Sequence, residues 1–228
     1  MIKAIVTDIE GTTTSISFVT EVLFPYARER MSSFLDAHKN EADVATEINA
    51  VRAEIGDPEA SLDIVKQTLQ QWIDNDKKIT PLKALQGMIW RSGYESGSLK
   101  GHLYPDVKKA LESWHADGVS LNVYSSGSVA AQKLIFGFSV DGDLTSLFEH
   151  YFDTKIGGKR EKNSYITIQQ QLNVAPESIL FLSDIVAELD AASEAGLQTL
   201  ALDRECICEG FGAHPFVHNF GQIDLSKF

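Results

Sequence analysis

The sequence predicts an α/β protein, a three-layer doubly wound parallel sheet with a helical cap. Two observations lead to this fold class. From residue 101 onward, short runs rich in β-branched residues alternate with amphipathic helical segments, the pattern of parallel strands joined by crossover helices. Earlier in the chain, the first such run, residues 2–7, is followed by a long stretch of helical periodicity without a strand. We therefore assign residues 1–15 and 100–228 to the α/β core and residues 16–99 to the cap.

Five strands are expected in the core. Each is a short apolar run that ends at polar residues or glycine: residues 2–7, 119–124, 151–153, 178–183 and 199–202. The segments between these strands predict helices that begin near residues 107, 129, 163 and 185. The tail after residue 209 shows no pattern that predicts an element.

Four helices are expected in the cap, at residues 21–37, 44–55, 62–73 and 80–93. In the last three, apolar residues recur along one helix face. The fourth helix is expected to have Thr80 as its N-cap and Pro81 as its first helical residue. Because Asp8 lies just before this bundle, we expect the bundle to lean over the residues that follow the first strand.

Composition and charge exclude several classes of partner. A net charge of -12 over 228 residues argues against nucleic acid, since phosphate backbones are held by clustered Lys and Arg. No stretch approaches the roughly 18 consecutive apolar residues that span a bilayer, and Met1 leads straight into the first strand without a signal-peptide pattern. We therefore expect a cytoplasmic protein with no membrane partner. Cys206 and Cys208, separated by one residue, imply neither a zinc site nor a disulfide framework.

Polar side chains follow several of the predicted strands. Asp8 and Glu10 come directly after the first strand, and alternation along an extended chain turns both to the same side. Parallel strands end at one edge of the sheet, where ligands bind in this class of fold, so these groups should meet in space. The candidate site residues are Asp8, Glu10, Ser125, Ser126, Gly127, Lys159 and Asp184.

This set of residues fits the hydrolysis of a phosphate monoester. Asp8 is the candidate nucleophile, and its attack on phosphorus gives an aspartyl-phosphate. A Mg²⁺ ion held by Asp8, the backbone after it and Asp184 would screen the repulsion between the carboxylate and the phosphate. Glu10 is placed to protonate the leaving oxygen and then to take a proton from the attacking water.

The phosphoryl oxygens need hydrogen-bond donors of their own. The hydroxyl of Ser125 or Ser126 and the N–H groups around Gly127, at a predicted helix N-terminus, are the candidates for this role. Lys159 would supply a cation opposite the metal ion, and Lys155 is its rival nearby.

The candidate site residues also have interpretations that involve no chemical function. Asp8 could cap a helix within a surface turn whose bend Gly11 allows, and the Ser-Ser-Gly-Ser stretch could cap the helix behind it. Lys159 lies in a run of charged residues, a kind of segment that is usually solvated, and Asp184 could cap the next helix. The order of these residues, each at a strand end, favours a site.

Four motifs resemble those of the haloacid dehalogenase superfamily of phosphohydrolases. They are Asp-x-Glu-Gly-Thr from residue 8, Ser-Ser-Gly from residue 125, a lysine ahead of a helix at 159 and Leu-Ser-Asp ending at 184. Most members of the superfamily carry Asp two residues after the nucleophile, whereas this chain has Glu10. That departure marks one branch, the enolase-phosphatases of methionine salvage. Similarity to this branch extends over residues 8–13, 83–87, 123–128, 131–134 and 152–159.

The resemblance implies a bifunctional reaction. A small phosphorylated diketone, 2,3-diketo-5-methylthiopentyl-1-phosphate, is enolised and then dephosphorylated to the acireductone. Family members are generally monomeric, so the resemblance also implies a monomer. By the family pattern, the Mg²⁺ positions are Asp8, Glu10 and Asp184, and the substrate contacts are Ser125, Ser126 and Lys159.

Two residue roles stay open at this point. The base for enolisation is Glu10, Lys159 or a residue of the cap. Glu188, one turn after Asp184, is an outer partner of the metal ion or a surface acid, and we expect the surface acid. A phosphatase of the same superfamily without enolase activity is the alternative function. A non-catalytic binding module is disfavoured because the nucleophile, Asp8, is present.

Overall fold

The computed structural model describes residues 1–207 and 210–228, so Cys208 lies outside the described residues. The chain divides into two compact units. Met1–Ile16 and Lys100–Phe228 form the α/β core unit, and Ser17–Leu99 form the helical unit. Within the described part of the chain, no helix combines the length and the apolar character needed to cross a membrane.

A six-stranded sheet forms the centre of the core unit, and all its paired strands are parallel. The strand order is β3-β2-β1-β4-β5-β6, the order of a doubly wound sheet, with the reversal of direction between β1 and β4. The predicted fold class is confirmed. The strands are β1 (Ala4–Thr7), β2 (Ser120–Tyr124), β3 (His150–Phe152), β4 (Ile179–Ser183), β5 (Gln198–Leu202) and β6 (Phe216–Val217).

The register of the sheet aligns the strand ends that carry the candidate residues. Thr7, the last residue of β1, pairs with Val123 of β2 and with Leu182 of β4. Asp8 is therefore level with the last residues of those two strands, and Ser125 and Asp184 each lie one residue beyond that level. All residues of β1 and β4 are buried, as expected for a parallel sheet that is covered on both faces.

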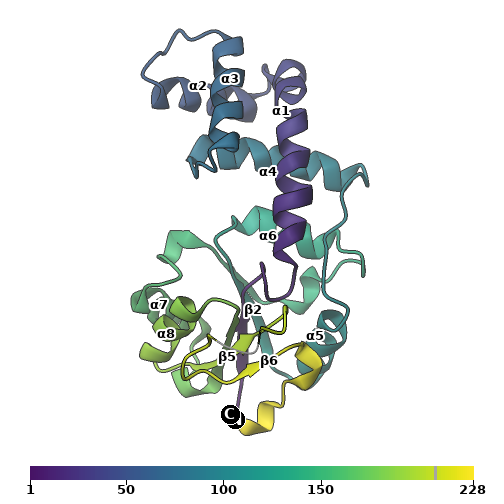
Figure 1. Cartoon of the computed structure of the whole chain (residues 1–228), viewed down its shortest axis with the longest axis vertical. Helices are drawn as coiled ribbons and strands as arrows, with labels where there is room; N and C mark the ends of the chain where they lie inside the picture. The colour runs from purple at the N-terminus through teal and green to yellow at the C-terminus, as the bar shows by residue number, and fades with distance from the viewer. Residues whose placement is uncertain (208–209) are drawn as a thin grey trace. The chain divides into compact units, whose positions relative to one another are not determined.

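Helices cover both faces of the sheet and give three layers (Figure 1). On one face, Tyr165 and Leu189 of two helices pack in one cluster with Val6 and Phe181 of the strands. On the other side, α5 lies beside β2 and packs its Trp114 against the C-terminal segment. The helices are α5 (Val107–Ala116), α6 (Val129–Gly137), α7 (Lys162–Leu172) and α8 (Val186–Glu194).

The helical unit contains four α-helices around a core of its own, to which Met31, Ile48, Leu69 and Leu85 belong. A π-helical turn, Phe18–Leu23, precedes the first helix and was not expected from the sequence. The helices are α1 (Phe24–His38), α2 (Ala42–Glu54), α3 (Leu62–Asp74) and α4 (Thr80–Glu95).

One predicted detail is wrong, and one strand lies where none was predicted. Thr80 is already the first residue of α4 and Ile79 is its N-cap, because Ile79 has the extended backbone of a cap and no side chain caps this terminus. In the tail, Phe216–Val217 form the edge strand β6 beside Ala201 and Leu202. A strand of two residues is too short to show alternation, so no sequence pattern could predict it.

Candidate active site

The carboxylate of Asp8 lies at the carboxyl end of the central strand β1. The N–H of Asp8 donates to the Leu182 carbonyl at 2.9 Å, which continues the ladder between β1 and β4. Its Oδ1 accepts the N–H of Ile9 at 2.8 Å and pairs with Nζ of Lys159 at 2.6 Å. Only 2% of Asp8 is exposed, so it is a buried, oriented carboxylate and not a surface turn residue.

Lys159 is buried beside Asp8 and pairs with two carboxylates. Its Nζ lies 2.6 Å from Oδ1 of Asp8 and 2.7 Å from Oε2 of Glu188. Burial alone would lower the pKa of Lys159, but the charges of Asp8 and Glu188 outweigh burial and raise it. Lys155, the rival lysine, is exposed. The structure thus brings Lys159, and not Lys155, against the candidate nucleophile.

Two buried tyrosines hold the loop that carries Lys159. The Tyr165 hydroxyl donates to the Lys159 carbonyl at 2.6 Å, and the Tyr124 hydroxyl donates to the Gly157 carbonyl at 3.0 Å. Gly157 has a φ of +135°, and a Cβ there would overlap the Ser164 hydroxyl, so glycine is required at this turn. Strand β2 and helix α7 therefore set the position of the Lys159 backbone.

Glu188 lies in the candidate site, beside Lys159, and the sequence prediction missed this position. It was expected to be a surface acid, but it is only 8% exposed. Its Oε2 pairs with Lys159 and accepts the Ser183 hydroxyl at 2.9 Å. The expectation was wrong because Glu188 lies in the first turn of α8 on the buried side of that helix, next to Leu189. Its spacing of one turn from Asp184 was the signal that could have identified it.

Glu10 and Ser125 meet across two neighbouring strand ends. The Ser125 hydroxyl lies 3.4 Å from Oε2 of Glu10 as a donor and accepts the N–H of Gly127 at 3.0 Å. Burial and then the charge of Asp8 raise the pKa of the Glu10 carboxyl. Ser128, not Ser125, is the N-cap of α6 and accepts the N–H of Ala131. The helix cap therefore does not account for Ser125, which is 1% exposed.

Asp184 carries a buried carboxylate oxygen that lacks a hydrogen-bond partner among the described residues, Oδ1. Burial and then the charge of Asp8 raise the pKa of Asp184 to about 7. Its carboxylate lies so close to Gly11 that a Cβ at Gly11 would overlap it. Gly11 also has a φ of +73°, so the turn after Glu10 requires glycine for both reasons.

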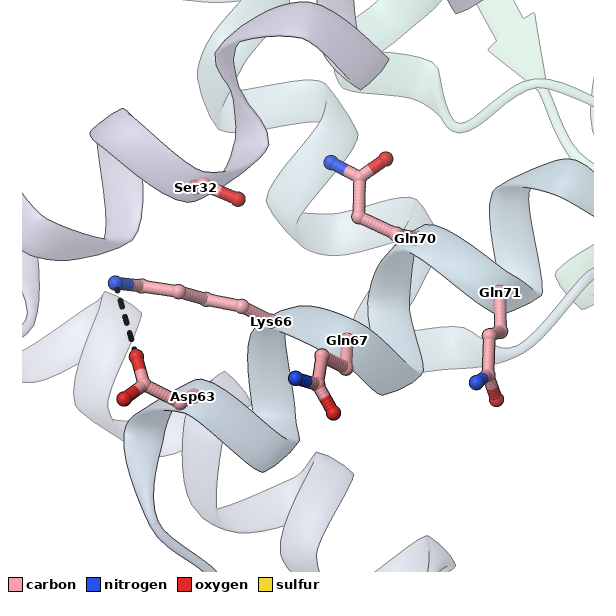
Figure 2. Close-up of a pocket in the computed structure, with 6 residues that line it drawn as sticks. All are labelled: Ser32, Asp63, Lys66, Gln67, Gln70 and Gln71. Carbon is pink, nitrogen blue, oxygen red and sulfur yellow. Dashed lines mark ion pairs between the residues drawn. The ribbon is translucent and has the colours of Figure 1, made fainter.

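A hollow on the helical unit is a second candidate site. Figure 2 shows its polar lining, which comes from α1 and α3. Its one cation, Lys66, pairs with Asp63 at 3.6 Å (Figure 2). Lys66 also pairs with Asp36 at 2.5 Å, so its charge is already matched. The hollow, of about 540 Å³, is lined by Ser32, Asp63, Lys66, Gln67, Gln70 and Gln71. It offers no nucleophile paired with a base, and the strand-end cluster remains the candidate active site.

Comparison with known proteins assigns the family. A family model described as haloacid dehalogenase-like hydrolase matches residues 2–196. Enolase-phosphatase E1 of Serratia proteamaculans is 52% identical over 228 residues, which are 100% of this chain and 99% of that protein. Enolase-phosphatase E1 of Citrobacter koseri is 56% identical over 226 residues, 98% and 97% of the two chains. This chain belongs to the haloacid dehalogenase-like hydrolases, among the enolase-phosphatases.

Solved structures agree with this membership. The UTR4 protein of Saccharomyces cerevisiae has a TM-score of 0.83 at 30% identity, with 98% of this chain and 100% of that chain covered. CbbY of Rhodobacter sphaeroides in complex with phosphate has a TM-score of 0.61 at 16% identity over 97% and 96% of the chains, which supports the fold alone. The predicted family and the predicted phosphatase class are confirmed.

In this haloacid dehalogenase-like hydrolase, four carboxylates lie within the electrostatic influence of one buried ammonium, that of Lys159. The pKa values of Glu10, Asp184 and Glu188 are all raised, by burial first and by the charge of Asp8 next. Lys159 alone does not neutralise this charge, so the site is built to take up a cation or a proton. The four acids are Asp8, Glu10, Asp184 and Glu188.

The residues at the strand ends fit the Mg²⁺ ion that phosphatases of this family generally use. Oδ1 of Asp184 is buried without a hydrogen bond from the described residues, as a ligand oxygen would be in the absence of its ion. No three His, Cys, Asp or Glu side chains among the described residues form a complete protein-only metal cluster. Mg²⁺ does not need one, because it binds through one or two carboxylates and keeps several waters. Asp8 and Asp184 meet this requirement.

Proposed function

We propose that this phosphatase acts on 2,3-diketo-5-methylthiopentyl-1-phosphate in methionine salvage. It enolises the diketone and then removes the phosphate, which gives 1,2-dihydroxy-3-keto-5-methylthiopentene. One observation carries the proposal: the buried pair of Asp8 and Lys159, with Glu10 two residues on. It occurs in a chain that is 52% and 56% identical to two enolase-phosphatases E1 over nearly their whole lengths.

In the phosphatase half of the reaction, Asp8 attacks phosphorus through a carboxylate oxygen. A bond forms between that oxygen and phosphorus, and the bond from phosphorus to the substrate oxygen breaks. Glu10 donates the proton that the leaving oxygen takes up, and it then removes a proton from the water that attacks the aspartyl-phosphate. A raised pKa supports this double role, because Glu10 must be protonated in one step and ionised in the next. Hydrolysis restores Asp8 and releases inorganic phosphate.

Groups at several strand ends compensate the negative charge of the phosphoryl group. The ammonium of Lys159, the hydroxyls of Ser125 and Ser126 and the N–H groups around Gly127 bind its oxygens. Asp8, Glu10 and Asp184 would hold Mg²⁺, which would supply the positive charge that lets an anionic nucleophile approach an anionic phosphate.

Enolisation needs a base that removes a proton from the carbon bearing the phosphate ester. Lys159 is poorly suited, because Asp8 and Glu188 raise its pKa and keep it protonated. Glu10 is the better candidate of the two, since its carboxylate faces the same site and its side chain is longer than that of Asp. We therefore assign the proton abstraction to Glu10 and charge stabilisation of the enolate to Lys159.

Substrate selection, oligomeric state, location and cofactor complete the proposed function. The core residues described above all act on phosphate, metal or protons, so we assign substrate selection to the helical unit as a cap. The enzyme is proposed to act as a monomer in the cytoplasm, with Mg²⁺ as its cofactor. The alternative is a small-molecule phosphatase of the same superfamily without enolase activity.

The experiment that separates these functions is an absorbance assay for the conjugated enol on the diketo phosphate with Mg²⁺. It is run beside a phosphate-release assay, and both are repeated with p-nitrophenyl phosphate. We expect enol and phosphate from the diketo substrate and slow turnover of the generic ester. Phosphate release from generic esters alone, without an enol product, would leave only the alternative function.

A further inference from the structure

A buried arginine outside the catalytic cluster binds the loop that follows Asp8. The side chain of Arg204 is only 5% exposed and lies just beyond β5. Its Nε and Nη2 both donate to the Thr12 carbonyl, at 2.9 and 2.7 Å. Two donors from one planar guanidinium on one oxygen fix the position of that carbonyl more tightly than a single hydrogen bond does.

The far side of the guanidinium is anchored in two other parts of the core unit. Nη1 donates to both carboxylate oxygens of Asp106, at 2.9 and 2.8 Å. Asp106 also accepts the N–H of Phe220 at 2.7 Å. The guanidinium carbon lies 4.2 Å from the ring centre of Tyr104 and 5.0 Å from that of Phe220. The C-terminal segment, which shows no sequence pattern, therefore helps to hold Arg204 in place.

The loop that Arg204 binds is closed on itself and carries two site residues. The N–H groups of residues 12, 13 and 14 all donate to the Ile9 carbonyl, at 3.1, 2.9 and 2.9 Å. The N–H of Gly11 donates to the Thr14 carbonyl at 2.8 Å. Glu10 and Gly11 lie inside this closed loop, and Gly11 touches the Asp184 carboxylate. Displacement of Thr12 would therefore displace Glu10 and Gly11 with it.

We propose that Arg204 is a positioning residue for the reaction, which acts through the Thr12 carbonyl to hold Glu10 against the scissile phosphate ester. Asp106 and the segment around Phe220 are the fixed points from which it acts. The inference rests on the proposed function for the role of Glu10. Burial of a cation away from water is costly unless partners compensate for it, and the partners here are the Asp106 carboxylate and the carbonyl of the loop next to the site.

The test compares Arg204→Lys with the wild-type enzyme. Lysine keeps the charge but cannot donate to Thr12 and Asp106 in the same planar arrangement. We expect kcat to fall at least about tenfold with KM within about threefold, because a small misplacement of a catalytic group slows chemistry more than it weakens binding. We also expect faster hydrogen exchange at the amides of residues 12–14. Arg52→Lys is the matched control, because Arg52 donates to the Ala60 carbonyl at 2.9 Å in the helical unit; its kcat should stay at the wild-type value.

A second variant covers the case in which Arg204→Lys does not fold. Asp106→Asn leaves Arg204 and the loop untouched but weakens the anchor, and it should change kcat and the exchange of residues 12–14 in the same direction. Faster exchange at these amides with an unchanged kcat would overturn the proposal, because the role would then be structural only. Loss of folding in both variants would overturn it as well.

All rates are measured on the diketo phosphate and on p-nitrophenyl phosphate. Wild-type enzyme that fails on the diketo phosphate overturns the proposed substrate. The comparison of Arg204→Lys with wild type on the generic ester is still decisive for the role of Arg204.

Discussion

Burial separates the charged residues that belong to the site from those that are merely solvated. Lys159 begins a run of four charged residues, yet it is only 9% exposed and pairs with Asp8 and Glu188. Arg160, its neighbour, is exposed. A charge is buried in a protein only when partners compensate for the loss of water, and Asp8 and Glu188 are those partners here.

Replacement of Lys159 by Met should abolish most of the phosphatase activity. Phosphate release is expected to fall by about 10²–10³-fold, the usual effect of losing one group that stabilises developing charge. The free energy of unfolding should fall by about 3 kcal/mol, because Asp8 and Glu188 lose their buried cation. Lys155→Met, in the same loop but exposed, is the control and should match the wild type in both assays. Equal rates for the two variants would contradict the role of Lys159.

Asp184 should make the metal-free protein less stable as the pH rises. Its folded-state pKa is raised from 3.8 to about 7, so between these values the folded protein binds more protons than the unfolded chain. Stability contributed by this group is therefore lost as the pH increases through that window.

Asp184→Asn should accordingly stabilise the metal-free protein at about pH 8 by about 1–2 kcal/mol, a value reduced for partial exposure. Added Mg²⁺ should stabilise the wild type but not the variant, because an ion that binds only the folded state shifts unfolding. Thermal unfolding with EDTA and with Mg²⁺ checks both statements. An equal shift by Mg²⁺ in the two proteins would contradict a ligand role for Asp184.

At the scale of secondary-structure elements, the turns that end the strands are as specific as the strands themselves. Gly11 adopts a φ of +73° directly against Asp184, whereas Gly56 adopts a φ of +70° at the end of α2 with open space around it. These two glycines share a backbone conformation and differ in their surroundings.

Gly11→Ala and Gly56→Ala should therefore have different effects. Gly56→Ala is expected to cost about 1 kcal/mol from backbone strain alone and to leave turnover unchanged. Gly11→Ala adds an overlap with the Asp184 carboxylate, so it should be less stable and should lose most of its activity. Unfolding and turnover of both variants can be measured side by side. Equal losses in the two proteins would show that the Gly11 environment has no special role.

Local patterns explain which elements and site residues could be predicted from the sequence. Asp8, Ser125 and Asp184 directly follow apolar runs, so their positions after predicted strands were enough to place them at one edge of the sheet. Glu188 and Arg204 could not be assigned in that way, because their partners Lys159 and Thr12 are distant in sequence.

At the scale of the whole molecule, the doubly wound sheet brings segments that are distant in sequence together in one site. Asp8 and Lys159 are far apart in the chain, yet the strand order β3-β2-β1-β4 brings their carboxylate and ammonium to 2.6 Å. The helical unit is inserted between Ile16 and Lys100, so the core keeps this sheet although its chain is interrupted. The roles of the site residues stay predictions, and the nucleophile is the one on which the others depend.

The most direct test of the proposed mechanism is a single-turnover experiment with the diketo phosphate, quenched in acid and followed by mass analysis of the peptide that contains Asp8. We expect a transient phosphate on Asp8 in the wild type, and neither that adduct nor phosphate release in Asp8→Asn, which keeps the shape but loses the nucleophile. Phosphate release by Asp8→Asn at a rate near that of the wild type, with no adduct in either protein, would contradict covalent catalysis by Asp8.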